Sequence, residues 1–379
     1  MRARDLGIKI GELALGSHNA ITDVDGVRVG HSTIVRGEGP LVVGEGPVRT
    51  GVTVVCPREG MARDEPFFAG SHRFNGNGEM TGLEWIREAG ALATPVAITN
   101  THSVGIVRDA LVTAEMEARA DEEDYWCLPV VAETYDGILN DINGQHVTVD
   151  HVREALANAT GGPVAEGSVG GGTGMICHEF KGGIGTSSRR LPDEEGGWTV
   201  GALVQANYGR RSMLRVDGAP VGRVLSTERV PSPFEHGEET LPAGTGSIIV
   251  VLATDAPLLP TQCDRLAKRA GIGFGRMGGG LDDGSGDIFL AFATGNSGIP
   301  RAGLSPPPTV PLKMVSNDYM TPLFHAAAEA TEEAILNALL AAGDMTGRDG
   351  IKAHGLTTQL LLGALDEARA LCARHDVET

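Results

Sequence analysis

A serine preceded by a glycine begins the most apolar strand-like segment of this chain. A Pro/Gly loop runs into Gly246-Ser247, and Ile-Ile-Val-Val-Leu-Ala-Thr follows. If the bond between Gly246 and Ser247 were cut, Ser247 would become an N-terminal residue at the mouth of a buried strand. Its freed α-amino group, with an ordinary pKa of about 7.7–8.0, would then serve as the base for a hydroxyl that is otherwise a weak nucleophile. This pair predicts acyl-transfer chemistry, and the alternative is a Gly-Ser junction that only begins a strand.

A second serine and a carboxylate stand two residues apart in Gly284-Ser285-Gly286-Asp287. Side chains two residues apart point the same way if the segment is extended. Asp287 is therefore expected to orient Ser285, and Ser285 to hydrogen-bond the nucleophile or its amine. An ordinary turn uses the same residue types.

Polar side chains also close two other strand-like runs. Asn207 ends the run 198–208, where its amide could donate to a developing oxyanion. Glu133 ends the run 129–133, and Tyr135 follows it. A carboxylate there could bind a substrate ammonium group, and the tyrosine could hydrogen-bond the reacting centre. The alternatives are a turn asparagine, a solvated acid and a packed aromatic ring.

Other motifs for chemistry are weak or missing. Residues 273–278 match G-x-G-x-x-G, but they follow a helix-like segment rather than a strand, which disfavours nucleotide binding. The eleven histidines show neither H-E-x-x-H nor zinc-like spacing with cysteines. No G-x-S-x-G elbow is present either. We therefore expect no metal and no cofactor, and we expect Cys177 and His178 to be packing residues.

Composition narrows the partners and the compartment. A net charge of −18 and a pI near 5.0 argue against nucleic acid and anionic membrane surfaces. The first residues lack the apolar segment of a signal peptide, and no apolar run is long enough for a bilayer. The five cysteines are scattered without a C-x-x-C pair, which favours free thiols. Together these features predict a cytoplasmic protein.

The elements that must position these residues alternate between strand and helix patterns along 379 residues. With no separating linker, the pattern predicts a single α/β domain over 1–379. A hairpin with an Asp-Gly turn is expected at 21–31, and a polar connection that tolerates cutting at about 228–246. Strand-like segments are expected at 51–56, 95–100, 129–133, 198–208, from 247 onward and at 288–293, and a glycine-rich mixture of strand and turn at 167–177. Helices are expected at 83–89, 107–118, 149–157, 259–269, 322–342 and 357–374.

Several separated segments together resemble the self-processing serine aminopeptidases, the family of the L-aminopeptidase D-amidase/esterases and β-peptidyl aminopeptidases. Their order and spacing carry the resemblance, since each is short. The segments are 21–31 (Ile-Thr-Asp-Val-Asp-Gly-Val-Arg-Val-Gly-His), 49–55, 75–82 (Asn-Gly-Asn-Gly-Glu-Met-Thr-Gly), 99–105 (Thr-Asn-Thr-His-Ser-Val-Gly), Gly246-Ser247 with its strand, and 284–287.

The resemblance implies a four-layer αββα sandwich of the N-terminal-nucleophile type. It implies autocleavage at 246/247 into a large chain, 1–246, and a small chain, 247–379. The two chains stay assembled, and such proteins are commonly homo-oligomers. The implied roles are Ser247 as nucleophile, Ser285 as the second serine that positions it, Asp287 where some relatives carry Glu, Asn207 at the oxyanion, Tyr135 assisting there, and Glu133 at the substrate's free amine.

The sequence thus predicts an aminopeptidase that releases N-terminal residues through an acyl-enzyme. Its substrates would be short peptides, amino-acid amides or esters with a free amine. The choice among α-peptides, β-peptides, D-amino-acid amides and esters stays open. One alternative is an acetyltransferase similar to ornithine acetyltransferases, whose nucleophile is typically threonine rather than a serine such as Ser247. The other is an unprocessed, non-catalytic scaffold of the same fold.

Overall fold

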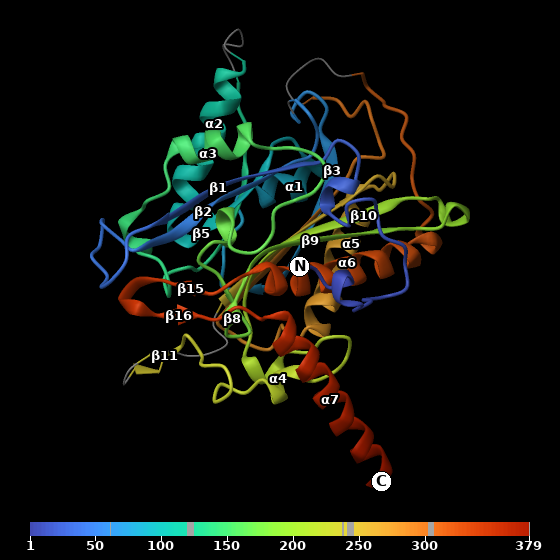
Figure 1. Ribbon diagram of the computed structural model, residues 1–379. Helices are drawn as coiled ribbons and strands as arrows, with labels where there is room; N and C mark the ends of the chain where they lie inside the picture. The colour runs from blue at the N-terminus through green and yellow to red at the C-terminus, as the bar shows by residue number, and fades with distance from the viewer. Residues whose placement is uncertain (61, 120–124, 237–238, 241–245, 302–306, 379) are drawn as a thin grey trace.

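Two β-sheets lie face to face, and helices cover the outer face of each (Figure 1). The computed structural model describes residues 1–60, 62–119, 125–236, 239–240, 246–301 and 307–378. The layering is the αββα sandwich that the resemblance implied. Separate apolar clusters fill the space between the sheets and the space beneath the helices on each side.

The first sheet has the strand order β1-β2-β5-β6. Its strands are β1 (Arg28–Arg36), β2 (Val48–Cys56), β5 (Val96–Asn100) and β6 (Val130–Thr134). The pair β5–β6 is parallel and the other pairs are antiparallel. The helices α2 (Val104–Glu117) and α3 (Val149–Ala157) pack on its outer face.

The second sheet has the order β4-β3-β14-β13-β10-β9, and it carries the serine-initiated strand near its centre. Its strands are β3 (Phe67–Gly76), β4 (Ala91–Leu92), β9 (Gly183–Arg190), β10 (Thr199–Asn207), β13 (Gly246–Thr254) and β14 (Ser285–Ala293). Only β13–β14 is parallel among these pairs. The helices α5 (Pro260–Arg276) and α6 (Thr321–Ala341) cover its outer face.

The remaining elements are short or peripheral, apart from the C-terminal helix α7 (Thr358–Glu378), which extends away from the sandwich in Figure 1. They are α1 (Leu83–Ala89), α4 (Val221–Val224), β7 (Ile176–Cys177), β8 (Phe180–Lys181), β11 (Glu235–His236), β12 (Glu239–Thr240), β15 (Met345–Thr346) and β16 (Lys352–Ala353). Among the described residues, no helix combines the length and apolar character that crossing a bilayer requires.

The helix α5 is longer than its predicted range of 259–269 and contains several glycines. Gly273 is one place where a glycine is needed, because a Cβ there would lie 2.4 Å from the carbonyl oxygen of Ala328 on α6. The close crossing of the two helices therefore depends on the missing side chain. Most of the G-x-G-x-x-G match lies inside this helix, so it does not form the loop that would cradle a phosphate.

The expected hairpin is wrong, whereas the expected mixture of strand and turn at 167–177 is found. The predicted hairpin at 21–31 does not form, because Ile21–Asp23 is a 3-10 helix and the Asp-Gly turn connects it to β1. The partner of β1 is β2, which lies further along the chain. Within 167–177, only Ile176–Cys177 is a strand, and Gly170–Gly172 form a 3-10 turn between the sheets. Part of the predicted connection at 228–246 lies outside the described residues.

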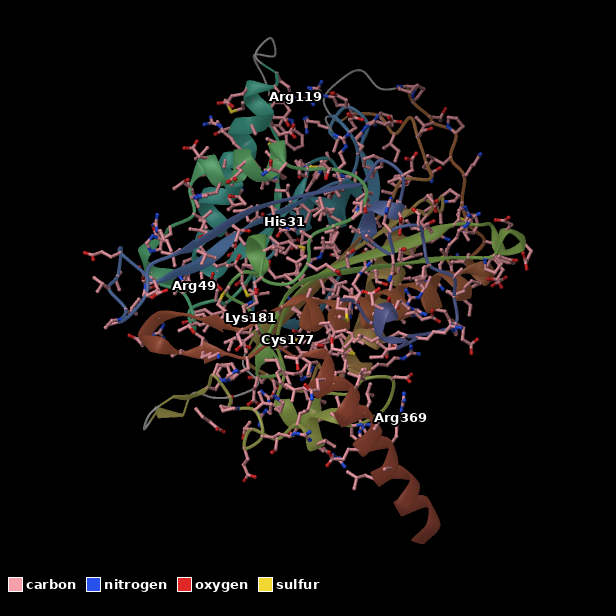
Figure 2. The ribbon with its side chains drawn as sticks, viewed as in Figure 1. His31, Arg49, Arg119, Cys177, Lys181 and Arg369 are labelled. Atoms are coloured by element: carbon pink, nitrogen blue, oxygen red, sulfur yellow. The ribbon has the colours of Figure 1, made fainter. Side chains whose placement is uncertain are left out.

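Buried charges join the N-terminal segment and β9 to α6. The Arg189 guanidinium contacts the carboxylates of Glu329 and Glu333 at 3.0 and 2.7 Å. Figure 2 shows Lys181 beside Cys177 near the end of the sandwich. The Lys181 ammonium donates to the carbonyls of Gly172 and Gly182, and burial lowers its pKa to about 7. These contacts, like the buried side chains of Cys177 and His178, belong to the packing.

Candidate active site

The register of the second sheet brings the polar residues from distant parts of the chain together. Ser247 lies opposite Asn207 on β10 and opposite Gly286 on β14. Ile249 and Val251 of β13 point into the core between the sheets. Because side chains alternate along a strand, Ser247 faces the space between the sheets as well. The nucleophile candidate is therefore held by a backbone ladder on both sides.

The Ser247 hydroxyl lies against the peptide bond that precedes it. Its Oγ donates to the carbonyl oxygen of Gly246 at 2.6 Å and accepts from the backbone N–H of Gly286 at 3.3 Å. The residue is 4% exposed. A Cβ at position 246 would lie 2.1 Å from the carbonyl oxygen of Asn207, so glycine is required before the serine.

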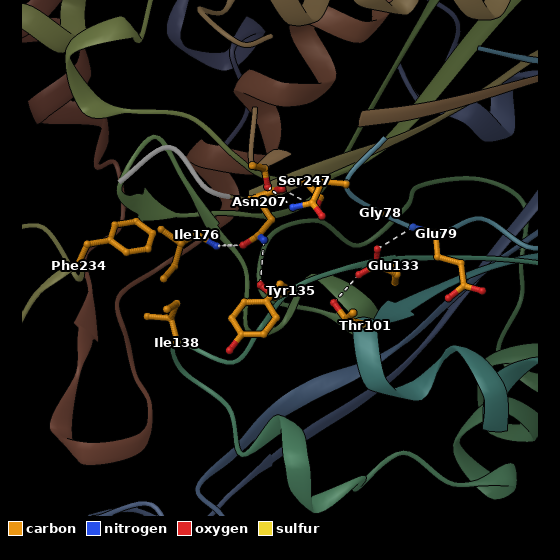
Figure 3. A pocket seen from close by; sticks show the side chains of 13 residues that line it. Gly78, Glu79, Thr101, Glu133, Tyr135, Ile138, Ile176, Asn207, Phe234 and Ser247 are labelled. Carbon is orange, nitrogen blue, oxygen red and sulfur yellow. Dashed lines mark hydrogen bonds between the residues drawn. The ribbon is translucent and has the colours of Figure 1, made fainter. Parts of the chain in front are cut away.

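Asn207 is fixed by both ends of its amide. Its Oδ1 accepts from the backbone N–H of Ile176 at 2.8 Å, and its Nδ2 donates to the carbonyl of Tyr135 at 2.9 Å (Figure 3). A carboxamide nitrogen has two hydrogens, and this bond uses one of them. The other is the donor that a developing oxyanion beside Ser247 would need.

Ser285 and Asp287 form a pair at the start of β14. The Ser285 hydroxyl donates to Asp287 Oδ1 at 2.6 Å. Burial raises the pKa of Asp287 to about 6. Asp287 lies opposite Ile248 on β13, and Ile248 faces the helices. Paired residues share a face of the sheet, so Ser285 and Asp287 support β13 from the side opposite to Ser247. A contact between Ser285 and the freed amine of Ser247 stays a prediction.

Glu133 brings the first sheet into the site. It is the last residue but one of β6 and is 3% exposed. One carboxylate oxygen accepts from the backbone N–H of Glu79 at 2.9 Å, and the other accepts from the Thr101 hydroxyl. Burial raises the pKa of Glu133, although both hydrogen bonds favour the ionised form. The sequence analysis assigned no role to Glu79 or Thr101, although the segments 75–82 and 99–105 that carried the resemblance contain them.

Tyr135 reaches the site through its backbone. Its carbonyl accepts from Asn207, while the ring is 44% exposed. The phenol oxygen lies over Gly137, where a Cβ would be 2.4 Å from it. In Figure 3 the hydroxyl points away from Ser247. In this orientation the phenol makes no hydrogen bond to the reacting centre, so the expected bond stays a prediction.

A cavity of about 420 Å³ is lined by Ser247, Asn207, Glu133 and Tyr135. Figure 3 shows Glu133 and Thr101 on one side of Ser247 and an apolar end on the other. The apolar end is made by Ile138, Ile176 and Phe234. The cavity thus offers a place for an ammonium group, a carbonyl and an apolar group at once. No cluster of three or more His, Cys, Asp or Glu suited to a metal occurs in the described part of the chain.

Comparison with known proteins agrees with this arrangement. The model of peptidase family S58 matches residues 19–353. The β-peptidyl aminopeptidase BapA of Sphingosinicella microcystinivorans is 49% identical over 379 residues, which cover 98% of this chain and 93% of the relative. A solved β-aminopeptidase from Burkholderia sp. is 62% identical with a TM-score of 0.90, covering 97% of this chain and 99% of that one.

A third similar protein identifies the fold. The structure of an L-aminopeptidase D-Ala-esterase/amidase from Ochrobactrum anthropi is described as a variant of the Ntn hydrolase fold. It is 45% identical with a TM-score of 0.87, over 97% of this chain and 98% of that one. Fold and site thus define an N-terminal-nucleophile hydrolase of the aminopeptidase class. The chain belongs to peptidase family S58, and this membership favours the peptidase over the acetyltransferase alternative.

Proposed function

We propose that this chain cuts itself between Gly246 and Ser247 and then acts as a serine aminopeptidase with Ser247 as nucleophile. The observation that carries the proposal is the position of Ser247 Oγ, 2.6 Å from the carbonyl oxygen of Gly246 and directly beside Asn207 and Gly286. The same hydroxyl lines a cavity that also contains the buried carboxylate of Glu133.

In the maturation step, Ser247 Oγ attacks the carbonyl carbon of Gly246 and its proton passes to the departing nitrogen. The peptide bond breaks, and Gly246 is transferred to the Ser247 oxygen as an ester. Water then hydrolyses the ester, leaving a carboxylate on Gly246 and a free amine on Ser247. The amine is the base that the hydroxyl needs in later turnovers.

In turnover, Ser247 attacks the carbonyl of the substrate's N-terminal residue and its α-amine takes the hydroxyl proton. The second hydrogen of Asn207 Nδ2 stabilises the oxyanion. The amine gives its proton to the leaving group, and water releases the acyl group from Ser247. Glu133 selects a free N-terminus, because its buried carboxylate is costly to leave without a cationic partner.

The cavity favours short peptides, amino-acid amides or esters with a free amine and an apolar N-terminal side chain. Ile138, Ile176 and Phe234 would receive that side chain. Relatives whose names specify β-peptides or D-Ala esters and amides share the fold, so these substrates are the first to test. We also propose a cytoplasmic homo-oligomer of cut heterodimers.

The intact mass of the purified protein under denaturing conditions tests the proposal. Cleavage predicts two species of about 26 and 14 kDa, in proportion to residues 1–246 and 247–379 of the 39.5 kDa chain. The smaller species should begin with Ser247 on N-terminal sequencing. A single 39.5 kDa species without aminopeptidase activity would support the unprocessed scaffold instead.

Replacing Asn207 by Ala should slow turnover by about 10²–10³-fold, the usual cost of losing one oxyanion donor. The change also removes the bonds to Ile176 and Tyr135, so thermal unfolding of the variant must be followed in parallel. Single-turnover acylation of a chromogenic amide measures the effect. A variant that folds like the wild type and acylates within threefold of its rate would exclude the oxyanion role.

The raised pKa of Asp287 predicts a feature of the pH profile. Its ionised carboxylate is the stronger acceptor for the Ser285 hydroxyl, and burial raises the pKa of Asp287 to about 6. As the pH falls, kcat/KM should first decline as the Ser247 amine protonates, and then fall more steeply below about pH 6 as Asp287 takes a proton. The Asp287→Asn variant should be slower and lack the steeper part. If the variant keeps it, another group causes it.

A further inference from the structure

A second hollow adjoins the catalytic cavity. Its volume is about 430 Å³, and it shares Gly78 and Glu79 with the cavity that contains Ser247. Two arginines, Arg73 and Arg87, line it. The two hollows thus meet along the segment whose Glu79 N–H holds Glu133.

Strand register places Arg73 on the same face of the sheet as Ser247. Arg73 lies opposite Ile288, which points into the space between the sheets. Gly76 lies opposite Gly286, and Gly286 lies opposite Ser247. Neighbouring strands are about 4.8 Å apart, so Gly76 is about 10 Å from Ser247. The Arg73 side chain folds back over Gly76, since a Cβ there would lie 3.3 Å from Arg73 Cδ.

The charge of Arg73 is not used by a described neighbour. The described contacts pair Arg87 with Glu84 on the same helix, whereas none of them pairs Arg73 with an acid. Arg73 and Arg87 are the only cationic side chains among the described residues that line these two hollows. In a chain of net charge −18, an exposed arginine that lines the hollow beside the active site, and to which the described contacts give no acidic partner, is a specific feature.

The positions proposed for the substrate's amine, carbonyl and side chain determine how the substrate lies in the site. With the amine at Glu133, the carbonyl at Ser247 and the side chain at the apolar end, the leaving part must depart elsewhere. Gly78 borders both hollows without a side chain and packs directly on Gly286, since a Cβ on Gly78 would lie 3.1 Å from Gly286 Cα. The leaving part would therefore cross over the Gly78 backbone. One or two further residues extend about 3.5–7 Å, and the Arg73 side chain can cover the remaining distance.

We propose that Arg73 binds the free C-terminal carboxylate of the leaving part, so that the site recognises both ends of a dipeptide or tripeptide. A guanidinium group can donate two parallel hydrogen bonds to the two oxygens of a carboxylate. The inference rests on the proposed function, because it needs Ser247 as nucleophile and Glu133 at the amine. It adds that Arg73 is a specificity-determining residue for free peptide acids.

Three substrates with the same apolar N-terminal residue test the proposal: β-homoleucyl-alanine, its C-terminal amide, and β-homoleucyl-p-nitroanilide. The wild type should show a lower KM for the acid than for the amide. The Arg73→Gln variant should raise KM for the acid about five- to tenfold, with kcat within twofold, and remove the preference over the amide. The anilide carries no carboxylate, so its KM should change less than twofold.

The Arg87→Gln variant is the matched control, because it removes a cation from the same hollow that is already paired with Glu84. It should leave the preference for the acid intact. Equal KM values for acid and amide in the wild type would overturn the proposal, and so would an equal effect of Arg73→Gln on both. A wild type that cleaves none of the three substrates and also stays a single 39.5 kDa chain would instead overturn the proposed function itself.

Discussion

Replacing Ser247 by Ala is expected to leave one uncut chain of 39.5 kDa with no measurable aminopeptidase activity. The change removes the atom that would attack both the Gly246 carbonyl and the substrate. Loss of the nucleophile alone in a serine hydrolase costs on the order of 10⁶ in kcat. Because Ser247 is 4% exposed and small, its loss should disturb the fold little. Denaturing mass spectrometry and an amide assay give the two readouts.

Ser316→Ala is a suitable control, since Ser316 is exposed and far along the chain from the site residues. It should process and turn over like the wild type. A Ser247→Ala protein that is cut normally would show that the cleavage is not self-catalysed by this serine. One that stays active would remove Ser247 from the chemistry altogether.

Replacing Glu133 by Gln should lower kcat/KM for substrates with a free amine by about 10- to 150-fold. This range corresponds to about 1.5–3 kcal/mol for a hydrogen bond to a charged group. The glutamine Oε1 can still accept from the Glu79 N–H, and the Thr101 hydroxyl can turn to accept from the glutamine NH2, so the fold should tolerate the change. Steady-state kinetics on an amide with a free N-terminus measures the effect. Self-cleavage needs no substrate amine and should proceed.

Glu79→Gln offers a comparison within the same cavity. Glu79 contacts Glu133 through its backbone N–H, which the substitution keeps, so an effect below threefold is expected. If Glu133→Gln also blocked self-cleavage, Glu133 would be acting on the nucleophile rather than on the amine. If it changed neither process, Glu133 would not be the amine site.

Local patterns predicted some elements to the residue. The helices Leu83–Ala89 and Val149–Ala157 agree with the predicted ranges, because each has apolar residues at helical spacing and a clear end. β3 and β9 were missed, since they carry His, Arg, Asn and Ser in place of an apolar run. Their polar residues are explained by partners far away in sequence, such as the carboxylates of α6 that face Arg189.

In the candidate site, too, some features are visible in the local sequence and others depend on distant partners. A serine at the start of an apolar strand is visible in the sequence, and so is a carboxylate at the end of another. That Thr101 and the N–H of Glu79 hold Glu133 could not be predicted, because those contacts join β6 to segments 32 and 54 residues away. The orientation of the Tyr135 phenol depends on Gly137 and the cavity shape, which no local pattern encodes.

The strand order of the second sheet determines what a cut before Ser247 would do to the molecule as a whole. β13 and β14 follow the cut, yet β10 and β9 lie on one side of them and β3 and β4 on the other, all of which precede it. The small chain would thus be clamped between two halves of the large one. Separating the two chains would break the backbone hydrogen bonds on both sides of the β13–β14 pair. It would also expose the apolar residues that pack on both faces of the sheet. Dissociation would then be coupled to unfolding, and the cut pair should melt in one transition whose midpoint rises with protein concentration, because one folded pair gives two free chains.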